Sequence, residues 1–145
     1  MKLIIKEDKK SELTVTVVYP EYNERVKKII DGLKREGHLL SGNDNGRMYQ
    51  ILISDIYYIE SVQKKVFIYT AEHVYASSKR LLELEKELMC DDFVKVSKTC
   101  LVNINKLVRI RNIANSRIEA ELKNGEKIII SRTYIKSIRK VILGE

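Results

Sequence analysis

The sequence has 145 residues, of which 44% are hydrophobic, so the chain is long enough for one folded domain with a small addition. Charged residues make up 32% of the chain, and no apolar run reaches the roughly 18 residues that a membrane-spanning helix needs. The first ten residues hold one run of three apolar residues followed by a charge cluster, so we expect no signal peptide. These features predict a cytoplasmic, globular protein.

The positive charge is concentrated in the C-terminal hundred residues. The formal net charge is +7, and residues 1–45 carry 9 Lys/Arg against 8 Asp/Glu, whereas residues 46–145 carry 18 against 12. An excess of six cations in one region is typical of a protein that binds a polyanion. The two cysteines, Cys90 and Cys100, form no CxxC motif and lie far from both histidines in sequence, so we expect no metal site. We also expect no disulfide, because disulfides are rare in cytoplasmic proteins, and no cofactor.

The first 45 residues predict a strand followed by an amphipathic helix. Residues 13–19 are β-branched and alternate, which favours a strand. Pro20 suits the first turn of a helix, and the helical spacing of apolar residues continues to Gly37, a candidate C-terminal cap. Residues 41–46 are rich in turn formers, so we place a boundary there between an N-terminal strand–helix extension, 1–45, and a second domain, 46–145.

The second domain predicts many short strands and two helices. A helix over 79–89 would be capped by Ser77 or Ser78, and a final helix would be capped by Ser131. Asn124-Gly125 is a strong signal for a two-residue turn. The predicted strands are 48–53, 55–61, 65–70, 73–77, 106–113, 116–122 and 126–131. The fold class is therefore mainly β (α+β overall), with short antiparallel sheets that curl or pack on each other.

Residues 93–103 break the strand pattern in an informative way. Phe93 to Val96 are mostly apolar, Ser97-Lys98-Thr99 are polar, and apolar residues resume from Cys100 to Val102. A polar interruption between two buried segments predicts an exposed tip that is held rigidly. Such a tip is suited to contact another molecule.

Three ordered motifs resemble the LytTR DNA-binding domain of bacterial transcriptional regulators. They are DIYYIES at 55–61, the segment LLELEKELMCDDFVKVSKTCLVNINKL at 81–107, and LKNGEKIIISRTYIKSI at 122–138. The resemblance covers roughly residues 47–143. It implies stacked short antiparallel sheets with small flanking helices. It also implies that loops from one side enter two successive major grooves of DNA and the minor groove between them.

The resemblance also implies which residues bind DNA. The loops map to Gln63-Lys64-Lys65, to Ser97-Lys98-Thr99 and to Arg132-Thr133. We expect Lys98, Ser97 and Lys64 to contact bases, because base edges carry the sequence information. We expect phosphate contacts from Lys65, Arg80, Arg132 and Lys136, and Lys79 opens a helix near the same tips. The complete predicted set is Lys64, Lys65, Lys79, Arg80, Ser97, Lys98, Thr99, Arg132, Thr133 and Lys136.

Several other charged residues are interpreted as ordinary surface groups. Lys95, Lys106, Arg109 and Arg111 alternate with apolar residues on strands, and we expect them on the outer face of a sheet. Asp91-Asp92 follows a helix and is expected to be solvated. The chain contains two S-x-x-K patterns without their companion motifs, so we expect no enzyme activity.

The leading hypothesis is a sequence-specific transcriptional regulator of double-stranded DNA. Many family members have a histidine at the position of Ser97, and they often have an arginine at the position of Lys98 or of Thr133. These departures motivate an alternative, a protein-interaction module that has lost specific DNA reading. Because 45 residues cannot hold a receiver domain, the protein resembles the stand-alone type, which is often encoded beside a membrane protein that restrains it.

The role of the N-terminal helix is left open by the sequence. It could pair two protomers, contact a restraining membrane protein, or pack on the β domain. We expect a weak or DNA-assisted homodimer, with two copies meeting on tandem DNA repeats.

Overall fold

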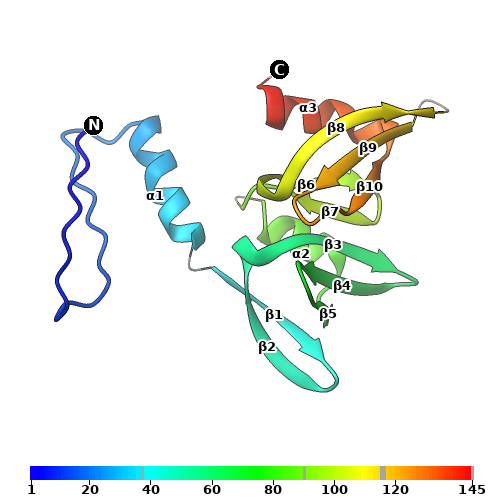
Figure 1. The fold of residues 1–145 in the computed structure, drawn as a ribbon, viewed down its shortest axis with the longest axis horizontal. Coiled ribbons are helices and arrows are strands. Elements are labelled where there is room, and N and C mark those ends of the chain that lie inside the picture. Colours follow the sequence, from blue (N-terminus) through cyan, green and yellow to red (C-terminus); the bar gives the residue numbers. More distant parts are fainter. Residues whose placement is uncertain (37, 90, 115–116, 145) are drawn as a thin grey trace.

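The computed structural model describes residues 1–36, 38–89, 91–114 and 117–144. Its strands form two antiparallel sheets, flanked by short helices (Figure 1). The helices are α1 (Glu24–Glu36), α2 (Leu81–Glu87) and α3 (Ile135–Leu143), with 3-10 turns η1 (Ile53–Asp55), η2 (Ile104–Lys106) and η4 (Arg132–Tyr134). The strands are β1 (Leu39–Asp44), β2 (Arg47–Leu52), β3 (Ile56–Val62), β4 (Lys65–Thr70), β5 (Val74–Ser77), β6 (Phe93–Ser97), β7 (Cys100–Asn103), β8 (Leu107–Ile113), β9 (Arg117–Leu122) and β10 (Lys127–Ile130).

The larger sheet has seven strands in the order β2-β1-β5-β4-β3-β7-β6, and the smaller has the order β10-β9-β8. The prediction of a mainly β fold with sheets packed on each other is confirmed. Most predicted strands of the second domain agree with the observed ones to within one or two residues. None of the described helices is both long enough and apolar enough to cross a membrane.

Two hydrophobic clusters fill the body, and β7 contributes to both. Leu101 belongs to a cluster beneath α2 that includes Ile59, Ile68 and Leu84. Cys100 and Val102 point to the other side, into a cluster with residues of the small sheet and α3. All four residues of β7 are buried, which is the pattern of a strand covered on both faces. This double burial explains why apolar residues resume immediately after Ser97-Lys98-Thr99.

The structure corrects the prediction for the N-terminal segment. Residues 13–19 do not form a strand, because no strand among the described residues supplies hydrogen-bond partners for their backbone. The helix begins at Glu24 and not after Pro20, since Asn23 accepts a 3.0 Å hydrogen bond from the Val26 N–H and acts as its cap. Gly37, the predicted C-terminal cap, lies outside the described residues.

The turn-rich segment 41–46 is also more ordered than predicted. Residues up to Asp44 belong to β1, and only Asn45 and Gly46, with φ of 51° and 80°, form the turn into β2. Glycine is favoured at position 42 on β1, because a Cβ there would lie 2.7 Å from the Cβ atom of Tyr75, which cannot move without its backbone. Since β1 pairs with β2 and β5, it joins the sheet of the body although it precedes residue 46. The division of the chain at residue 45 stays a prediction.

The two N-terminal helix caps predicted in the second domain are not formed. Arg80 precedes α2 without a side-chain cap, and the Ser77 hydroxyl instead accepts a 3.1 Å hydrogen bond from the Lys79 N–H. The Ser131 side chain makes no capping bond to η4. Both helices are held by their apolar residues: Leu84 and Ile138 are almost fully buried. Burial of an apolar face stabilises short helices more than a single cap does.

Candidate nucleic-acid interface

The β3–β4 hairpin presents the first predicted DNA-binding loop. Val62 pairs with Lys65, so Gln63 and Lys64 alone form the turn, with φ of 51° and 69°. Positive φ at both central residues is the signature of a type I′ turn, whose twist matches that of the flanking strands. The side chains of Lys64 and Lys65 are exposed. The hairpin points away from α1, toward the right in Figure 1.

The β6–β7 hairpin presents the second loop. Ser97 pairs with Cys100, which leaves Lys98 and Thr99 as a two-residue turn. The Ser97 Oγ atom accepts a 3.2 Å hydrogen bond from the Thr99 N–H and lies 3.4 Å from the Thr99 hydroxyl. The Ser97 hydroxyl is therefore occupied in holding the turn, while Lys98 and Thr99 are exposed. This hydrogen bond gives the tip the rigidity that the sequence predicted.

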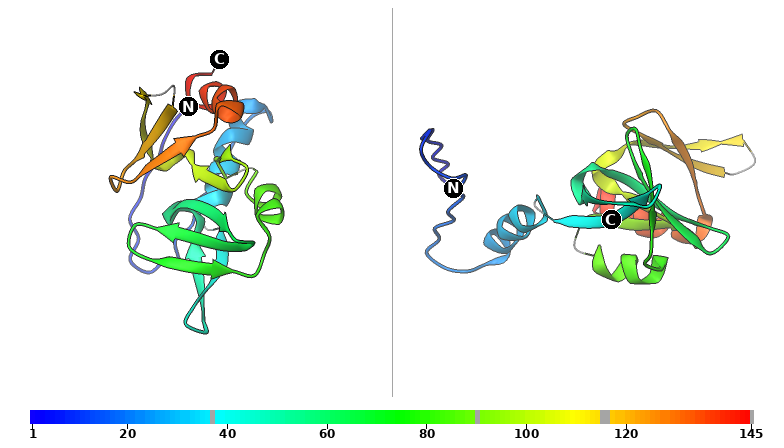
Figure 2. Two further views of the ribbon diagram at one scale, coloured as in Figure 1. Left: turned by 90° about the vertical axis from the view of Figure 1, so that its right-hand side faces the viewer. Right: turned by 90° about the horizontal axis from the view of Figure 1, so that it is seen from below.

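Two backbone hydrogen bonds bring the three loops together. The Ser61 N–H donates to the Thr99 carbonyl oxygen at 2.8 Å, which joins the two hairpins near their tips. The Ser131 N–H donates to the Val96 carbonyl oxygen, also at 2.8 Å, which places η4 beside β6. Arg132 is exposed in η4. The three predicted loops thus lie at one end of the molecule, which the left view of Figure 2 shows from the front.

The remaining predicted residues lie close to these loops. Ser77 pairs with Val66, so the segment that carries Lys79 and Arg80 leaves β5 beside the start of β4. Lys79 forms an ion pair of 2.5 Å with Glu87, which offsets part of its charge. Thr133 and Lys136 are exposed in η4 and the first turn of α3. The backbone therefore gathers the whole predicted set around the same end of the body.

The charges that the sequence assigned to outer faces have partners within the chain. Arg109 pairs with Glu121, and Arg111 with Glu119 at 3.0 Å. Lys95 lies 3.5 Å from Glu85, and Lys106 lies 5.1 Å from the centre of the Tyr57 ring. Pairing of this kind reduces their attraction for a polyanion. Lys95, Arg109 and Arg111 lie on strands as predicted, whereas Lys106 lies in η2 and is half-buried, so the prediction of an outer strand position is wrong for Lys106.

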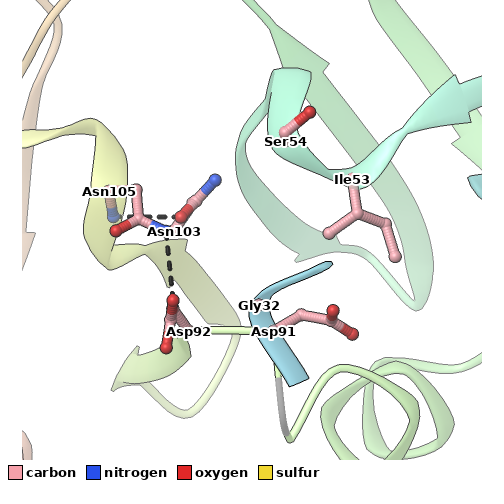
Figure 3. Close-up of a pocket in the computed structure, with 7 residues that line it drawn as sticks. All are labelled: Gly32, Ile53, Ser54, Asp91, Asp92, Asn103 and Asn105. Atoms are coloured by element: carbon pink, nitrogen blue, oxygen red, sulfur yellow. Dashed lines mark hydrogen bonds between the residues drawn. The ribbon is translucent and has the colours of Figure 1, made fainter. Parts of the chain in front are cut away.

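A polar cluster that the sequence did not predict lies at the opposite end of β7. Asn103 is buried, and its side chain donates a 2.8 Å hydrogen bond to the Ile56 carbonyl oxygen and accepts one from the Asn105 N–H. The Asn105 side chain donates to Asp92 at 3.2 Å (Figure 3). Asn103 therefore ties β7 to β3 and begins η2. The asparagine of the Leu-Val-Asn motif was the available signal for this structural role.

The prediction that Asp91 is solvated is wrong. Its side chain is buried, its Oδ2 atom lies 3.1 Å from His38 Nδ1, and its Oδ1 atom has no hydrogen-bond partner. Figure 3 shows Asp91 turned away from Asp92 and Asn103, beside the cavity of about 280 Å³ that Gly32 and Ile53 also line. In the part of the chain that the structure describes, no three His, Cys, Asp or Glu side chains are grouped to hold a metal ion.

Burial raises the pKa of three groups on β3, β4 and β7, the strands that lead to the first two predicted DNA-binding loops. Desolvation and the nearby Glu60 carboxylate raise the pKa of the Cys100 thiol to about 12. Tyr58 and Tyr69 stack with their ring centres 4.2 Å apart. Desolvation raises the pKa of both phenols, helped by the Glu126 and Glu60 carboxylates. All three groups are neutral at physiological pH.

Comparison with known proteins agrees with this geometry. The sequence model described as "LytTr DNA-binding domain" matches residues 46–143, about two thirds of the chain. The chain belongs to the LytTR DNA-binding domain family. The body of this LytTR protein is therefore a DNA-binding domain, and the resemblance inferred from the three motifs is confirmed.

A solved structure shares the fold of this LytTR protein. It is the "LytTr DNA-binding domain of putative methyl-accepting/DNA response regulator from Bacillus cereus", with a TM-score of 0.67 and 24% sequence identity. The match covers 74% of this chain and 97% of the other. Because the identity is low, this match supports the fold alone.

The relatives in sequence are of two kinds, which differ in the share of their own length that this chain covers. "Sensory transduction protein LytT" of Bacillus anthracis is 34% identical over 90 residues, which are 62% of this chain and 37% of that protein. The chain thus spans little more than a third of that relative. "Uncharacterized HTH-type transcriptional regulator SAS2254" of Staphylococcus aureus is 28% identical over 134 residues, 91% of this chain and 90% of that protein. That match includes most of the segment before β1.

Proposed function

We propose that this protein is a bacterial transcriptional regulator that binds specific sites on double-stranded DNA in the cytoplasm. The observation that supports the proposal most directly is the joining of three cationic loops at one end of a DNA-binding domain by the Ser61–Thr99 and Ser131–Val96 hydrogen bonds. The regulators named among the relatives support the assignment to transcription. The protein acts by binding, since the site offers cations and hydroxyls on a surface.

The contact that we propose for each residue, with a base or with a phosphate, follows from the geometry of its loop. Lys64 and Lys98 stand at the tips of two-residue turns, where a side chain reaches furthest from the body and can enter a major groove. Lys65, Arg80, Arg132 and Lys136 lie behind the tips and are suited to phosphates. Thr99 and Thr133 offer hydroxyls, and Ser97 acts by fixing the turn that presents Lys98.

The partners of the protein are part of the proposal. Two copies bind tandem repeats in a promoter, with weak association in solution that DNA strengthens. A membrane protein encoded nearby restrains the regulator. The S. aureus relative, which is named as a transcriptional regulator, is matched over 90% of its own length, and this supports a regulatory role for a protein of this extent.

A mobility-shift titration tests the function. The probes are the duplex upstream of the protein's own coding region and a duplex of the same composition in scrambled order, each over a salt series. We expect tighter binding to the native duplex by at least about tenfold, and affinity that falls steeply as salt rises. Equal affinity for both duplexes at every salt concentration would contradict sequence-specific regulation. Absence of binding to either duplex would favour the alternative, a protein-interaction module.

A further inference from the structure

Residues 1–36, here called the N-terminal segment, contribute nothing to the core of the body. Every buried side chain of the described residues comes from Leu40 or later. Ten of the 22 exposed large hydrophobic residues belong to this segment, which is only a quarter of the chain: Met1, Leu3, Ile4, Ile5, Leu13, Val15, Val18, Tyr19, Tyr22 and Leu33. A concentration of exposed apolar side chains on this scale marks an interaction surface.

The segment also leaves its backbone without partners. Two extended stretches, 1–7 and 12–19, meet at a turn in which Asp8 accepts hydrogen bonds from Lys10 and from Ser11. The Ser11 N–H to Asp8 carbonyl bond is the only backbone–backbone hydrogen bond described within residues 1–22. Figure 1 shows both stretches standing apart from the body, with α1 between them and β1. Each stretch therefore offers strand edges for pairing.

An apolar groove runs between the second stretch and α1. Its volume is about 480 Å³, and its lining includes Val15, Val17, Val26, Ile29 and Leu33. Two strands alone are marginally stable in water, whereas three or more strands packed on a helix are stable. The segment thus supplies a helix and two extended stretches, and it lacks the further strands that a stable sheet packed on a helix requires.

We propose that the missing strands come from a second copy of this chain, so that the N-terminal segment is the homodimer surface of the protein. Residues 2–7 of the two copies pair in antiparallel fashion about a two-fold axis between Ile4 and Ile5. In the dimer the two extended stretches of each copy also pair with each other, so that the two copies together form a four-stranded sheet, and the two copies of α1 cover it. This interface deepens the proposed pairing of two copies on DNA, and it rests on that part of the proposed function.

The charges of the segment favour a second copy over a nucleic acid. Residues 1–36 carry 9 Lys/Arg and 7 Asp/Glu, a difference of two, so the segment lacks the strong positive charge of the body. In the antiparallel register about Ile4 and Ile5, Lys2 of each copy lies opposite Glu7 of the other. Opposite charges across a strand pair stabilise it, so the sequence of this stretch is complementary to itself.

The size of the segment fits such an interface. A stable interface between two proteins uses about 20–30 residues from each partner. The N-terminal segment supplies 36 residues, and it stands on the side of the body away from the β3–β4 hairpin (Figures 1 and 2). Pairing through it leaves the reading loops of both copies free for DNA.

Sedimentation equilibrium of the full chain without DNA tests the proposal. We expect reversible dimerisation of the wild type. Lys2→Glu should weaken it about three- to thirtyfold, because two pairs of like charges replace two attractive pairs in each dimer. Lys2→Glu combined with Glu7→Lys should restore it. Lys9→Glu makes the same charge change in the turn, outside the register, and should leave the dimer constant within about twofold.

Four results would overturn the proposal. The first is a wild type that stays monomeric up to about 100 μM, and the second is a dimer that still forms when Ile4→Glu and Ile5→Glu are combined. The third is an equal weakening of the dimer by Lys2→Glu and by Lys9→Glu. The fourth is a failure of Lys2→Glu combined with Glu7→Lys to restore the dimer. Circular dichroism and urea unfolding confirm that each variant keeps a folded body, which these residues do not help to build. DNA binding by the monomer is measured in a separate assay. A monomer that binds DNA specifically would contradict this interface but not the proposed function.

Discussion

The backbone N–H of Ser61 donates a 2.8 Å hydrogen bond to the carbonyl oxygen of Thr99. This bond extends the pairing of β3 with β7 beyond Glu60 and Cys100. It joins the two hairpins close to the turns that carry Lys64 and Lys98, and so helps to fix the separation of those turns. A protein that reads two places along a duplex needs such a fixed separation, because DNA grooves recur at a fixed spacing.

The two tip lysines are expected to matter more for DNA binding than other exposed lysines. Lys98→Glu and Lys64→Glu should each weaken binding to the native site by about 1–3 kcal/mol and reduce discrimination against the scrambled duplex. Fluorescence anisotropy over a salt series measures both effects. The matched control is Lys123→Glu, an exposed lysine in the β9–β10 turn whose N–H bonds to Lys106 at the other end of β7. Comparable losses in all three variants would show that overall charge, and not position, controls binding.

Removal of a carboxylate near the interface should strengthen binding. Glu87 holds the Lys79 ammonium at 2.5 Å, so Glu87→Gln frees that cation and also removes a negative charge near the phosphates. We expect affinity to rise by up to about 1 kcal/mol at low salt and the salt dependence to steepen. Glu72→Gln serves as the control, because Glu72 lies in the β4–β5 turn at the opposite end of those strands. Unchanged affinity of Glu87→Gln would exclude Lys79 from the interface.

Asn103 is expected to be essential for stability and not for DNA contact. Asn103→Ala removes two hydrogen bonds and leaves the buried Ile56 carbonyl oxygen without its side-chain donor. The free energy of unfolding should fall by about 1–3 kcal/mol in urea titrations. Asn105→Ala, which removes only a side-chain bond from an exposed residue, should cost less than about 1 kcal/mol. A folded Asn103→Ala variant with unaltered stability but lost DNA binding would contradict this assignment.

Alkaline pH should destabilise the protein through Cys100, Tyr58 and Tyr69. Their pKa values are higher in the folded chain than the ordinary values of 9.0 for the thiol and 10.0 for the phenols. The unfolded chain therefore releases these protons first, and the free energy of unfolding falls as pH rises above about 9. Below that pH the three groups stay protonated in both the folded and the unfolded state, so they do not change the free energy of unfolding as pH changes.

Urea unfolding between about pH 8 and pH 11 measures this dependence. Cys100→Ala lowers stability at all pH values, because a buried side chain is shortened, but it should make the alkaline fall less steep. The comparison uses the slope, so the loss of packing does not obscure it. Identical slopes for the variant and the wild type would show that the thiol does not titrate differently in the two states.

The sequence predicted the body better than the N-terminal segment, for physical reasons. Alternation and turn chemistry are local signals, so β4 was located correctly, and Asn124-Gly125 does lie in the β9–β10 connection, although that connection is longer than the predicted two residues. Residues 13–19 carry the same local signal, but a strand also needs a neighbouring edge, which the chain alone does not provide. Local reasoning likewise assigned Asp91 to solvent, because the His38 side chain that contacts it is distant in the sequence.

The candidate site was predicted through the ordered motifs and the polar interruption at Lys98. What the sequence could not give is the mutual placement of the loops, because that depends on β3 pairing with β7 and on β6 contacting Ser131. It also could not separate the role of Ser97 from that of Lys98. Only the structure shows that the Ser97 hydroxyl is occupied within the turn.

The double burial of β7 has a consequence for how the protein is controlled. Local fraying of the hairpin that carries Lys98 would expose both hydrophobic clusters at once, so its amide protons should exchange with solvent about as slowly as those of the whole body. Such a hairpin is poorly suited to an order–disorder switch. We therefore expect cellular signals to govern where the protein is held and how many molecules are free, while each free molecule is always competent to read its site.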